Sequence, residues 1–407
     1  MNLLLLTPQY PFPPHQGTTI RNFHLLHHLA TRHDVHLLTF DAHPTAKAAA
    51  PEDPLPSLCR HITRVQMPPR RSVPKRAWST LLSPFPDMAL RLASQAMFLN
   101  LARLISEEEF DVVQVEGIEM AAFGFLVTVR PPGSRPLLVF DDHNAEYVLQ
   151  RSAFETDRRD PRRWLGALYS WIQWRKLMRY EARCCRTFDR VVAVSATDAD
   201  ALRALDPSIP VDVIPNGVDT DAYQPHPLPD NPAPTLAFTG KMDFRPNVDA
   251  MLWFCDRILP HVIRRIPDVQ LNIVGQSPHL RLQPLARDSH VTLTGFVPDV
   301  RPHIAEAAVF VVPLRMGGGT RLKVLEAMAM GKAMVSTTLG CEGLEVVSGQ
   351  EVVLADDEEQ FAGEVVALLN DPQRAGALGR RARAFVETRY AWERITPRLE
   401  NVIRSTW

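Results

Sequence analysis

The sequence predicts an α/β protein of two doubly wound domains, and three observations support this fold class. The chain has 407 residues, more than a single hydrophobic core normally accommodates, so two domains are expected. Short apolar runs alternate with helical patterns along most of the chain, which is typical of parallel strands joined by helices. Five prolines fall within residues 222–234, and because neither a helix nor a central strand tolerates this density, we predict a linker there.

The predicted first domain spans residues 1–221. It begins with a strand, a helix and a second strand at 2–8, 18–33 and 34–40. The helix is indicated by apolar residues at helical spacing, which are Ile20, Phe23, Leu26 and Leu29. Three further apolar runs predict strands at 111–117, 136–143 and 190–195.

The predicted second domain spans residues 235–385, where the alternation starts again. A helix is expected from about 247 to 265, and five apolar runs predict strands at 235–240, 269–275, 291–296, 308–314 and 333–338. The last helical stretch, roughly 371–407, has no strand after it. We expect its end, residues 386–407, to cross back to the first domain.

The composition is that of an ordinary soluble globular protein, with 45% hydrophobic residues, 22% charged residues and a net charge of -1, and nothing in it indicates nucleic acid. The cysteines are odd in number and lack CxxC spacing, which argues against a disulfide framework and a zinc site. The opening apolar run, Leu3 to Leu6, is too short for a signal peptide, and no run is long enough to span a membrane. We therefore expect a cytoplasmic protein.

The stretch PLRMGGGTRLKVLEAMAMGK places Gly317, Gly318 and Gly319 between a predicted strand and a predicted helix. Such a turn exposes backbone N–H groups at the positive end of the helix dipole and can bind an anion or a hydroxyl group. The alternative is a tight turn with no ligand. A dinucleotide-binding loop is disfavoured because the third glycine of that motif is missing, and a P-loop because no Gly-Lys-Ser/Thr closes the turn.

Thr320 can cap the helix that follows, and Glu326 then lies on the same helix face as Lys323. An exposed ion pair between Lys323 and Glu326 is the simplest interpretation of that spacing. A binding role for Glu326 is the alternative.

The run EAMAMG, residues 326–331, resembles the second-domain signature of glycosyltransferase family 4, the retaining sugar-nucleotide transferases with the GT-B fold. That signature is a glutamate, seven residues, then a glutamate followed by Ala-Met-Ala-x-Gly. Glu326 matches the second glutamate, whereas Gly318 stands where the first is expected. The glycine-rich form resembles a subgroup of exopolysaccharide and PEP-CTERM-associated sugar transferases. The resemblance extends over most of the chain and implies two Rossmann-like domains facing a cleft.

The resemblance also implies a donor site. Glu326 would bind the ribose hydroxyls of the nucleotide, and the backbone of Gly317 to Thr320 would hold the donor sugar and diphosphate. Gly17 matches a turn near the donor phosphates, and Gly240 lies in the stretch that resembles the opening of the donor domain.

Family members commonly carry an Arg or Lys just after the first donor-domain strand and a Lys six residues later. Lys241 matches the first position, but Asn247 occupies the second. Arg245 and Arg321 are candidates to replace that charge, because the leaving diphosphate needs a fixed cation. The alternative for each of these cations is a solvated surface position.

His143 matches a histidine that lies beside the donor sugar in relatives, and we assign it, with Lys241 and Arg321, to catalysis. A hydrogen-bonded structural histidine is the alternative. The neighbouring Asp141 and Asp142 raise the possibility of a metal-binding carboxylate pair. The two-domain pattern opposes that interpretation, and we expect no metal and no other cofactor.

Residues 151–190 contain eleven Arg and Lys against five acidic residues, together with Trp164, Trp171 and Trp174. A basic helical segment with tryptophans can rest on anionic lipid, which would suit a lipid-linked acceptor. The alternative is an insertion whose tryptophans pack on the first domain. Residues 68–78 add positive charge and are predicted as a surface loop.

The leading hypothesis is a retaining glycosyltransferase that moves a sugar from a nucleoside-diphosphate sugar to a saccharide or lipid-linked acceptor in exopolysaccharide or cell-envelope synthesis. Two alternatives remain open. One is a sugar-nucleotide epimerase or hydrolase of similar shape, and the other is a non-catalytic sugar-nucleotide-binding protein.

Overall fold

The computed structural model describes the chain except residues 43–52, 130–134, 159–162, 227–232, 318–320 and 406–407. It divides into two compact units: Met1–Pro215 with Thr396–Trp407, and Asn216–Ile395. The second unit thus begins before the predicted linker and includes part of the predicted final segment 386–407. The reason is a backbone contact, since the Val218 N–H donates to the Tyr390 carbonyl at 2.8 Å and ties these two stretches together.

The sheet of the first unit has seven strands in the order β3-β2-β1-β4-β5-β6-β7, and every neighbouring pair is parallel. One of its interior strands carries the run Leu3 to Leu6, which is fully buried because helices cover both faces of a parallel sheet. The strands are β1 (Asn2–Thr7), β2 (Asp34–Asp41), β3 (His61–Gln66), β4 (Val112–Glu116), β5 (Leu137–Asp142), β6 (Arg190–Ala193) and β7 (Val211–Val213).

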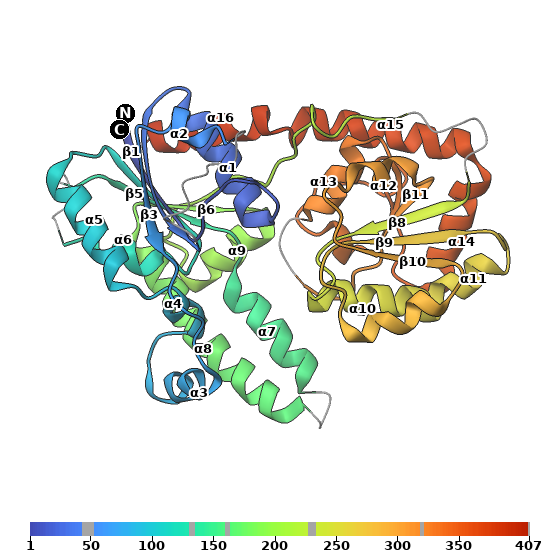
Figure 1. The fold of residues 1–407 in the computed structure, drawn as a ribbon, viewed down its shortest axis with the longest axis horizontal. Coiled ribbons are helices and arrows are strands. Elements are labelled where there is room, and N and C mark those ends of the chain that lie inside the picture. The colour runs from blue at the N-terminus through green and yellow to red at the C-terminus, as the bar shows by residue number, and fades with distance from the viewer. Residues whose placement is uncertain (43–52, 130–134, 159–162, 227–232, 318–320, 406–407) are drawn as a thin grey trace. The chain divides into compact units, whose positions relative to one another are not determined.

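Ten described helices have most or all of their residues in this unit (Figure 1). Two of them, α7 and α8, form a packed pair that extends away from the sheet. The predicted loop at 68–78 is wrong in part, since residues from Val73 onward form helix α3. The helices are α1 (Gly17–Ala30), α2 (Leu55–Leu58), α3 (Val73–Leu82), α4 (Asp87–Arg91), α5 (Gln95–Glu107), α6 (Ala121–Val127), α7 (Glu146–Asp157), α8 (Trp164–Thr187), α9 (Ala196–Leu205) and α16 (Trp392–Arg404).

The sheet of the second unit has six parallel strands in the order β10-β9-β8-β11-β12-β13. They are β8 (Thr235–Thr239), β9 (Gln270–Val274), β10 (Val291–Gly295), β11 (Val309–Val312), β12 (Ala333–Ser336) and β13 (Val353–Leu354). The predicted helix at 247–265 consists of α10 (Arg245–Trp253), a π-helical turn (Phe254–Ile258) and α11 (Leu259–Ile263). The other α-helices are α12 (Arg301–Glu306), α13 (Leu322–Ala329), α14 (Glu358–Asn370) and α15 (Pro372–Arg389).

Both sheets are doubly wound, as predicted. The strand order reverses beside β1 in the first sheet and beside β8 in the second. In such sheets ligands bind outside the carboxyl ends of the strands at the point of reversal. The fold therefore directs attention to the residues that follow β1, β4 and β5 in one unit, and β8 and β11 in the other.

Within the part of the chain that the structure describes, no helix combines the length and the apolarity needed to cross a lipid bilayer.

Candidate active site

At the carboxyl edge of the first sheet, His143 lies directly after β5 and Glu116 is the last residue of β4. The His143 Nε2 atom is 3.0 Å from Glu116 Oε2. With its amide nitrogen turned toward the same carboxylate, Asn22 of α1 donates to Glu116 Oε2 at 2.8 Å. The side chain of His143 is 16% exposed, so the imidazole remains accessible at the edge of the sheet.

Asp141, the neighbouring carboxylate, is held by Arg21 of α1. The Nε and Nη2 atoms of Arg21 each donate to an oxygen of Asp141 at 2.9 Å, and both side chains are buried. Arg21 also donates to the Pro215 carbonyl at 3.3 Å. This bidentate pair fixes α1 to β5, so Asp141 has a structural role.

Charge and burial act in opposite directions on His143. Burial by itself lowers the pKa of the imidazole, but the hydrogen bond with Glu116 and the charge of Asp141 together raise it above its ordinary value. Burial and the charge of Asp141 also raise the pKa of Glu116. His143 is therefore held as a hydrogen-bond donor over a wider pH range than a solvated histidine.

The side chains of Glu116, Asp141 and His143 place one potential ligand atom each within 4.8 Å of one another. Asp142, the other half of the carboxylate pair considered above, is not part of this group. Burial and the charge of Glu181 raise the pKa of Asp142 well above its ordinary value, which favours a neutral acid there. Arg21, Asn22 and His143 already contact the carboxylate oxygens that an ion would need.

At the carboxyl edge of the second sheet, Gly240 follows β8 and lies against two side chains. A Cβ atom at this position would stand 2.7 Å from both Asn247 Nδ2 and Lys323 Nζ. Glycine is needed there because any side chain would displace that pair. Asn247 in turn donates to the Lys241 carbonyl at 2.9 Å, which fixes its amide.

Lys323 of α13 is the cation that sequence analysis missed as a site residue. Its ammonium group donates to Asn247 Oδ1 at 2.8 Å and lies 3.9 Å from the centre of the Phe238 ring. Burial, with the charge of Arg321, lowers the pKa of Lys323 to about 7. The signal for it was the spacing that put Lys323 on the face of Glu326.

Glu326 pairs with a tyrosine instead of with Lys323. The Tyr223 hydroxyl donates to Glu326 Oε1 at 3.2 Å, and both residues are partly buried. Burial raises the pKa of Glu326. The exposed Lys323–Glu326 pair, which was the simplest interpretation of the sequence, is therefore wrong, because the helix face that carries both residues is turned inward.

The predicted cations differ in burial. Lys241 is exposed, and its ammonium group is 3.6 Å from Asp243. Arg321 is buried beside Gly317, whose positive φ of 106° favours glycine and whose Cβ position would lie 3.2 Å from the guanidinium group. Arg245 is the exposed first residue of α10.

The remaining predicted donor residues are Gly17, Gly318, Gly319 and Thr320. Gly17 is the first residue of α1, where backbone N–H groups are available to an anion. Gly318, Gly319 and Thr320 lie outside the described residues. The structure thus brings together Gly240, Lys323 and Asn247 in one unit, and His143, Glu116 and Asn22 in the other.

Two doubly wound parallel sheets define a protein of the GT-B fold, and solved structures share it. Sucrose-phosphate synthase from Thermosynechococcus elongatus is 19% identical, with a TM-score of 0.73, and the match covers 100% of this chain and 99% of that one. Anabaena Alr3699/HepE in complex with UDP-glucose is 14% identical, with a TM-score of 0.68, and the match covers 100% of both chains.

The family follows from the sequence models. Residues 16–222 match the model described as Glycosyltransferase Family 4, and residues 233–371 match the model described as Glycosyl transferases group 1. The chain therefore belongs to glycosyltransferase family 4.

Among individual relatives, a GDP-mannose-dependent alpha-(1-6)-phosphatidylinositol monomannoside mannosyltransferase of Mycolicibacterium smegmatis is 31% identical over 49% of this chain and 58% of its own length. A phosphatidyl-myo-inositol mannosyltransferase of Mycobacterium tuberculosis is 35% identical over 31% of this chain and 34% of its own length. The chain spans about half the length of the first of these curated relatives.

Proposed function

We propose that the protein is a retaining glycosyltransferase that transfers a sugar from a nucleoside-diphosphate sugar to a saccharide or lipid-linked acceptor. The observation that carries this proposal is the half-buried ammonium group of Lys323 at the carboxyl edge of the second sheet. It lies where α/β sheets bind ligands, and its hydrogen-bond partner is a neutral amide. An anionic diphosphate would pair with the positive charge of Lys323.

Lys323 stands in for the family lysine that is absent at Asn247. The side chain of Asn247 carries no charge, but its amide oxygen accepts a hydrogen bond from the Lys323 ammonium group at 2.8 Å. The positive charge is thus supplied from α13 instead of from α10. Arg321, buried beside Gly317, and the exposed Lys241 would add positive charge on the same unit.

Glu326 would accept hydrogen bonds from the ribose hydroxyls of the donor. Tyr223 orients this carboxylate through its 3.2 Å hydrogen bond. Because burial raises the pKa of Glu326, a ligand that donates hydrogen bonds to the ionised form favours that form.

The chemistry that suits these groups is a front-face transfer. The acceptor hydroxyl oxygen bonds to the anomeric carbon of the sugar while the bond from that carbon to the diphosphate oxygen breaks, and this oxygen takes the hydroxyl proton. Lys323 would stabilise the charge that develops on the leaving diphosphate, and His143 would donate a hydrogen bond beside the sugar. The proposed reaction requires no metal ion.

The names of relatives guide the choice of substrates to test. Mannosyltransferases among them are named for GDP-mannose and phosphatidylinositol acceptors, and Alr3699/HepE was solved with UDP-glucose. We propose a lipid-linked or saccharide acceptor in exopolysaccharide or cell-envelope synthesis, and a cytoplasmic enzyme that contacts the membrane peripherally through residues 151–190.

The first experiment is a thermal-shift panel with UDP, GDP, ADP and their common sugar conjugates, each with and without EDTA. A ligand at a hundred times its dissociation constant stabilises a protein by about 2.7 kcal/mol. A response to one nucleoside diphosphate that EDTA leaves unchanged supports the proposal, and Lys323→Met should reduce the shift at the same ligand concentration. No response to any nucleotide would contradict a donor site.

Product analysis then separates transfer from the other activities. A glycoside of retained anomeric configuration, seen by NMR, supports retaining transfer. Release of free nucleotide without a saccharide product would favour an epimerase or hydrolase, and binding without turnover would favour a non-catalytic sugar-nucleotide-binding protein.

A further inference from the structure

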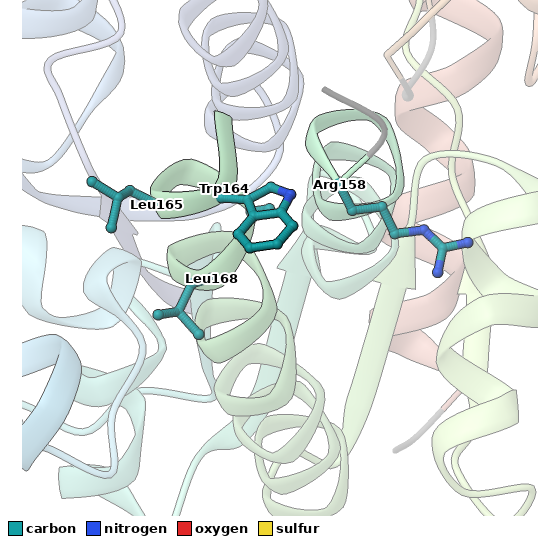
Figure 2. A pocket seen from close by; sticks show the side chains of 5 residues that line it. Arg158, Trp164, Leu165 and Leu168 are labelled. Atoms are coloured by element: carbon teal, nitrogen blue, oxygen red, sulfur yellow. The ribbon is translucent and has the colours of Figure 1, made fainter. Parts of the chain in front are cut away.

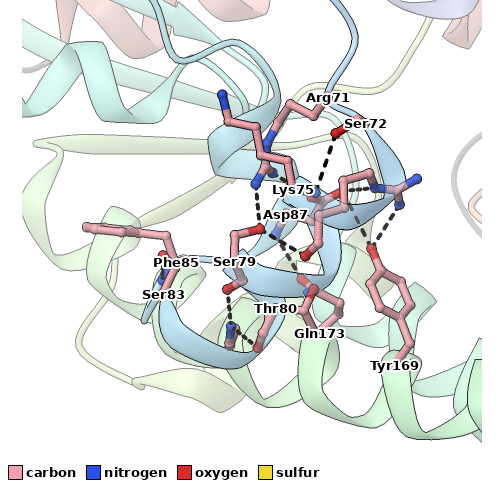
Figure 3. Close-up of polar contacts among 12 residues, drawn as sticks. Arg71, Ser72, Lys75, Ser79, Thr80, Ser83, Phe85, Asp87, Tyr169 and Gln173 are labelled. Carbon is pink, nitrogen blue, oxygen red and sulfur yellow. Dashed lines mark hydrogen bonds and ion pairs between the residues drawn. The ribbon is translucent and has the colours of Figure 1, made fainter.

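Helix α3 is attached to the first unit through its polar side. The Lys176 ammonium group of α8 donates to the carbonyls of Ser79 and Thr80, at 3.2 and 2.6 Å. Gln173 of the same helix donates to Thr80 Oγ1 at 3.1 Å. Figure 3 labels Ser79 and Thr80 of α3 and Gln173 of α8 at this junction. Thr80 is the only buried residue of α3.

Charged groups reinforce this attachment. Asp87, at the start of α4, accepts hydrogen bonds from Arg71 at 2.6 Å and from Arg76 at 3.1 Å (Figure 3). Arg76 also donates to the hydroxyl of Tyr169 on α8 at 3.1 Å. The arginines of this segment are thus partly used to hold α3 in place.

The apolar side chains of α3 point the other way. Those of Val73, Trp78, Leu81 and Leu82 are 67% to 76% exposed. A helix on the surface of a globular protein normally buries its apolar face and exposes its polar one. Since these apolar side chains of α3 are exposed, they are available to an apolar environment outside the unit.

The first turns of α8, next to α3, carry more exposed apolar surface. Trp164, Leu165, Leu168 and Trp171 are 45% to 87% exposed, and three of them repeat at helical spacing along one stripe. Figure 2 shows Trp164, Leu165 and Leu168 at the end of α8, with Arg158 of the α7 terminus beside them. The expectation that the tryptophans pack on the first domain holds only for Trp174, which stacks on Phe154.

Exposed cations accompany these apolar side chains. They are Arg70, Lys75, Arg158, Arg175 and Arg179. Three of the acidic residues near these cations are in ion pairs, Asp87 with Arg71 and Arg76, Glu155 with Arg151, and Asp157 with Arg163. The surface therefore combines apolar side chains, two exposed tryptophans on α8 and an excess of positive charge.

We propose that α3 and the first half of α8 form one membrane-binding surface, here called the α3–α8 surface, that lies in the headgroup region of an anionic bilayer. Apolar and tryptophan side chains insert at that depth, and each Lys or Arg adds attraction to anionic lipid. A second copy of the chain is a poorer occupant, because the like charges of two such surfaces would repel. The inference rests on the part of the proposed function that places residues 151–190 at the membrane, and it does not depend on the proposed sugar transfer.

The test is sedimentation of the full chain with vesicles of phosphatidylcholine alone or with about a third phosphatidylglycerol, a mixture that gives the surface anionic character. Leu81→Ser with Leu82→Ser removes exposed apolar side chains, so the fold should remain intact. The matched control is Leu99→Ser with Val129→Ser, which removes comparably exposed apolar side chains elsewhere in the first unit. The α3 variant should bind anionic vesicles roughly tenfold more weakly, and the control should bind as the natural chain does.

A second pair of variants tests the charge. Lys75→Gln with Arg175→Gln should weaken binding to the anionic vesicles about 25-fold, or about fivefold for each cation, since each is worth about 1 kcal/mol near an anionic surface. The control with the same net charge is Arg265→Gln with Arg287→Gln, two exposed cations of the second unit, which should have no effect.

Three results would overturn the inference: no sedimentation of the natural chain with anionic vesicles, equal loss in variants and controls, or a dimer in the absence of lipid that Leu81→Ser with Leu82→Ser dissociates. The thermal shift with nucleotides should be the same in the natural chain and in all four variants. Loss of vesicle binding with nucleotide binding intact, or the reverse, therefore separates this inference from the proposed function.

Discussion

The carboxyl edges of the two sheets share one strand order but differ in the sign of their charges. At the first edge, the carboxylates Glu116, Asp141 and Asp142 gather, and Arg21 neutralises Asp141 within the chain itself. At the second edge, Lys323 is the central group, and its hydrogen-bond partner is the neutral Asn247.

The difference shows that topology chooses where a ligand can bind and that side chains decide which ligand. An edge whose buried charges are paired within the chain loses stability when one partner is removed, whereas an edge whose cation has a neutral hydrogen-bond partner suits an anion. The donor site proposed above therefore lies at the second edge, with Lys323 as the group that would bind the diphosphate.

The largest effect is expected at the paired edge. Arg21→Met leaves the buried Asp141 without its partner, and breaking a buried pair in this way costs about 3–5 kcal/mol of unfolding free energy. Urea denaturation would measure it. The control is Arg60→Met, whose ion pair with Asp34 is exposed and should matter far less. Equal costs in the two variants would mean that the Arg21 pair is not a structural anchor.

The next largest effect is expected at Lys323, on the second edge. Lys323→Met should weaken nucleoside-diphosphate binding about 10- to 100-fold, because a hydrogen bond to a charged group contributes about 1.5–3 kcal/mol. Isothermal titration calorimetry would measure the affinity. The melting temperature of the variant should not fall, since the change removes a buried charge. An unchanged affinity in Lys323→Met would mean that the diphosphate binds elsewhere, and the proposed difference between the two sheet edges would then be wrong.

The same lysine should make donor binding depend on pH. The folded-state pKa of Lys323 is about 7, and only the protonated form attracts a diphosphate, so affinity should fall by up to about tenfold per pH unit as the pH rises above 7. In Lys323→Met this part of the pH dependence should disappear.

Stability should respond to pH in the opposite direction. Between pH 7 and 10.5 the unfolded lysine binds more protons than the folded one, so the lysine's contribution raises the unfolding free energy with pH across that window. Urea denaturation at several pH values, in the natural chain and in Lys323→Met, would show whether the slope contains this contribution.

A smaller effect is expected at Glu326. Glu326→Gln keeps the volume but removes the charge that would accept hydrogen bonds from the ribose, so nucleotide affinity should fall by about tenfold, or about 1.4 kcal/mol. Tyr223→Phe, which removes only the orienting hydroxyl, should cost less. If Glu326→Gln changed neither affinity nor rate, Glu326 would not be the ribose ligand that the resemblance implies.

The smallest effect is expected at Lys241. This side chain is exposed and already near Asp243, so Lys241→Ala should lower turnover only a few-fold, since exposed pairs contribute up to about 1 kcal/mol. Steady-state kinetics would measure it. A larger loss of turnover in Lys241→Ala than in Lys323→Met would mean that Lys241, and not Lys323, is the main cation of the donor site.

Most of the fold could be predicted from apolar periodicity. All ten predicted strands are present in the structure, because a buried parallel strand is a continuous apolar run. The strands that the sequence did not reveal, β3, β7 and β13, lie at sheet edges. An edge strand buries less of its surface and needs fewer apolar residues, so its pattern is weak.

The candidate site was predictable only in part. The signature around Glu326 and the glycines next to it were sufficient to assign the family, whereas the donor-binding role that they imply stays a prediction. Nothing in the local sequence distinguishes an exposed Lys323 from one that reaches Asn247 across the sheet edge, because that choice depends on which face of α13 is buried. The sequence of α3 likewise does not reveal that its apolar side chains are exposed.

Local patterns therefore determined what is a property of short segments, which is the succession of strands and helices, the family signature and the excess of positive charge in 151–190. Tertiary packing decided which charged side chains are paired with each other and which have neutral partners. Pairing depends on contacts between residues far apart in the chain, such as Arg21 with Asp141 and Asn247 with Lys323, and no short-range pattern specifies those contacts.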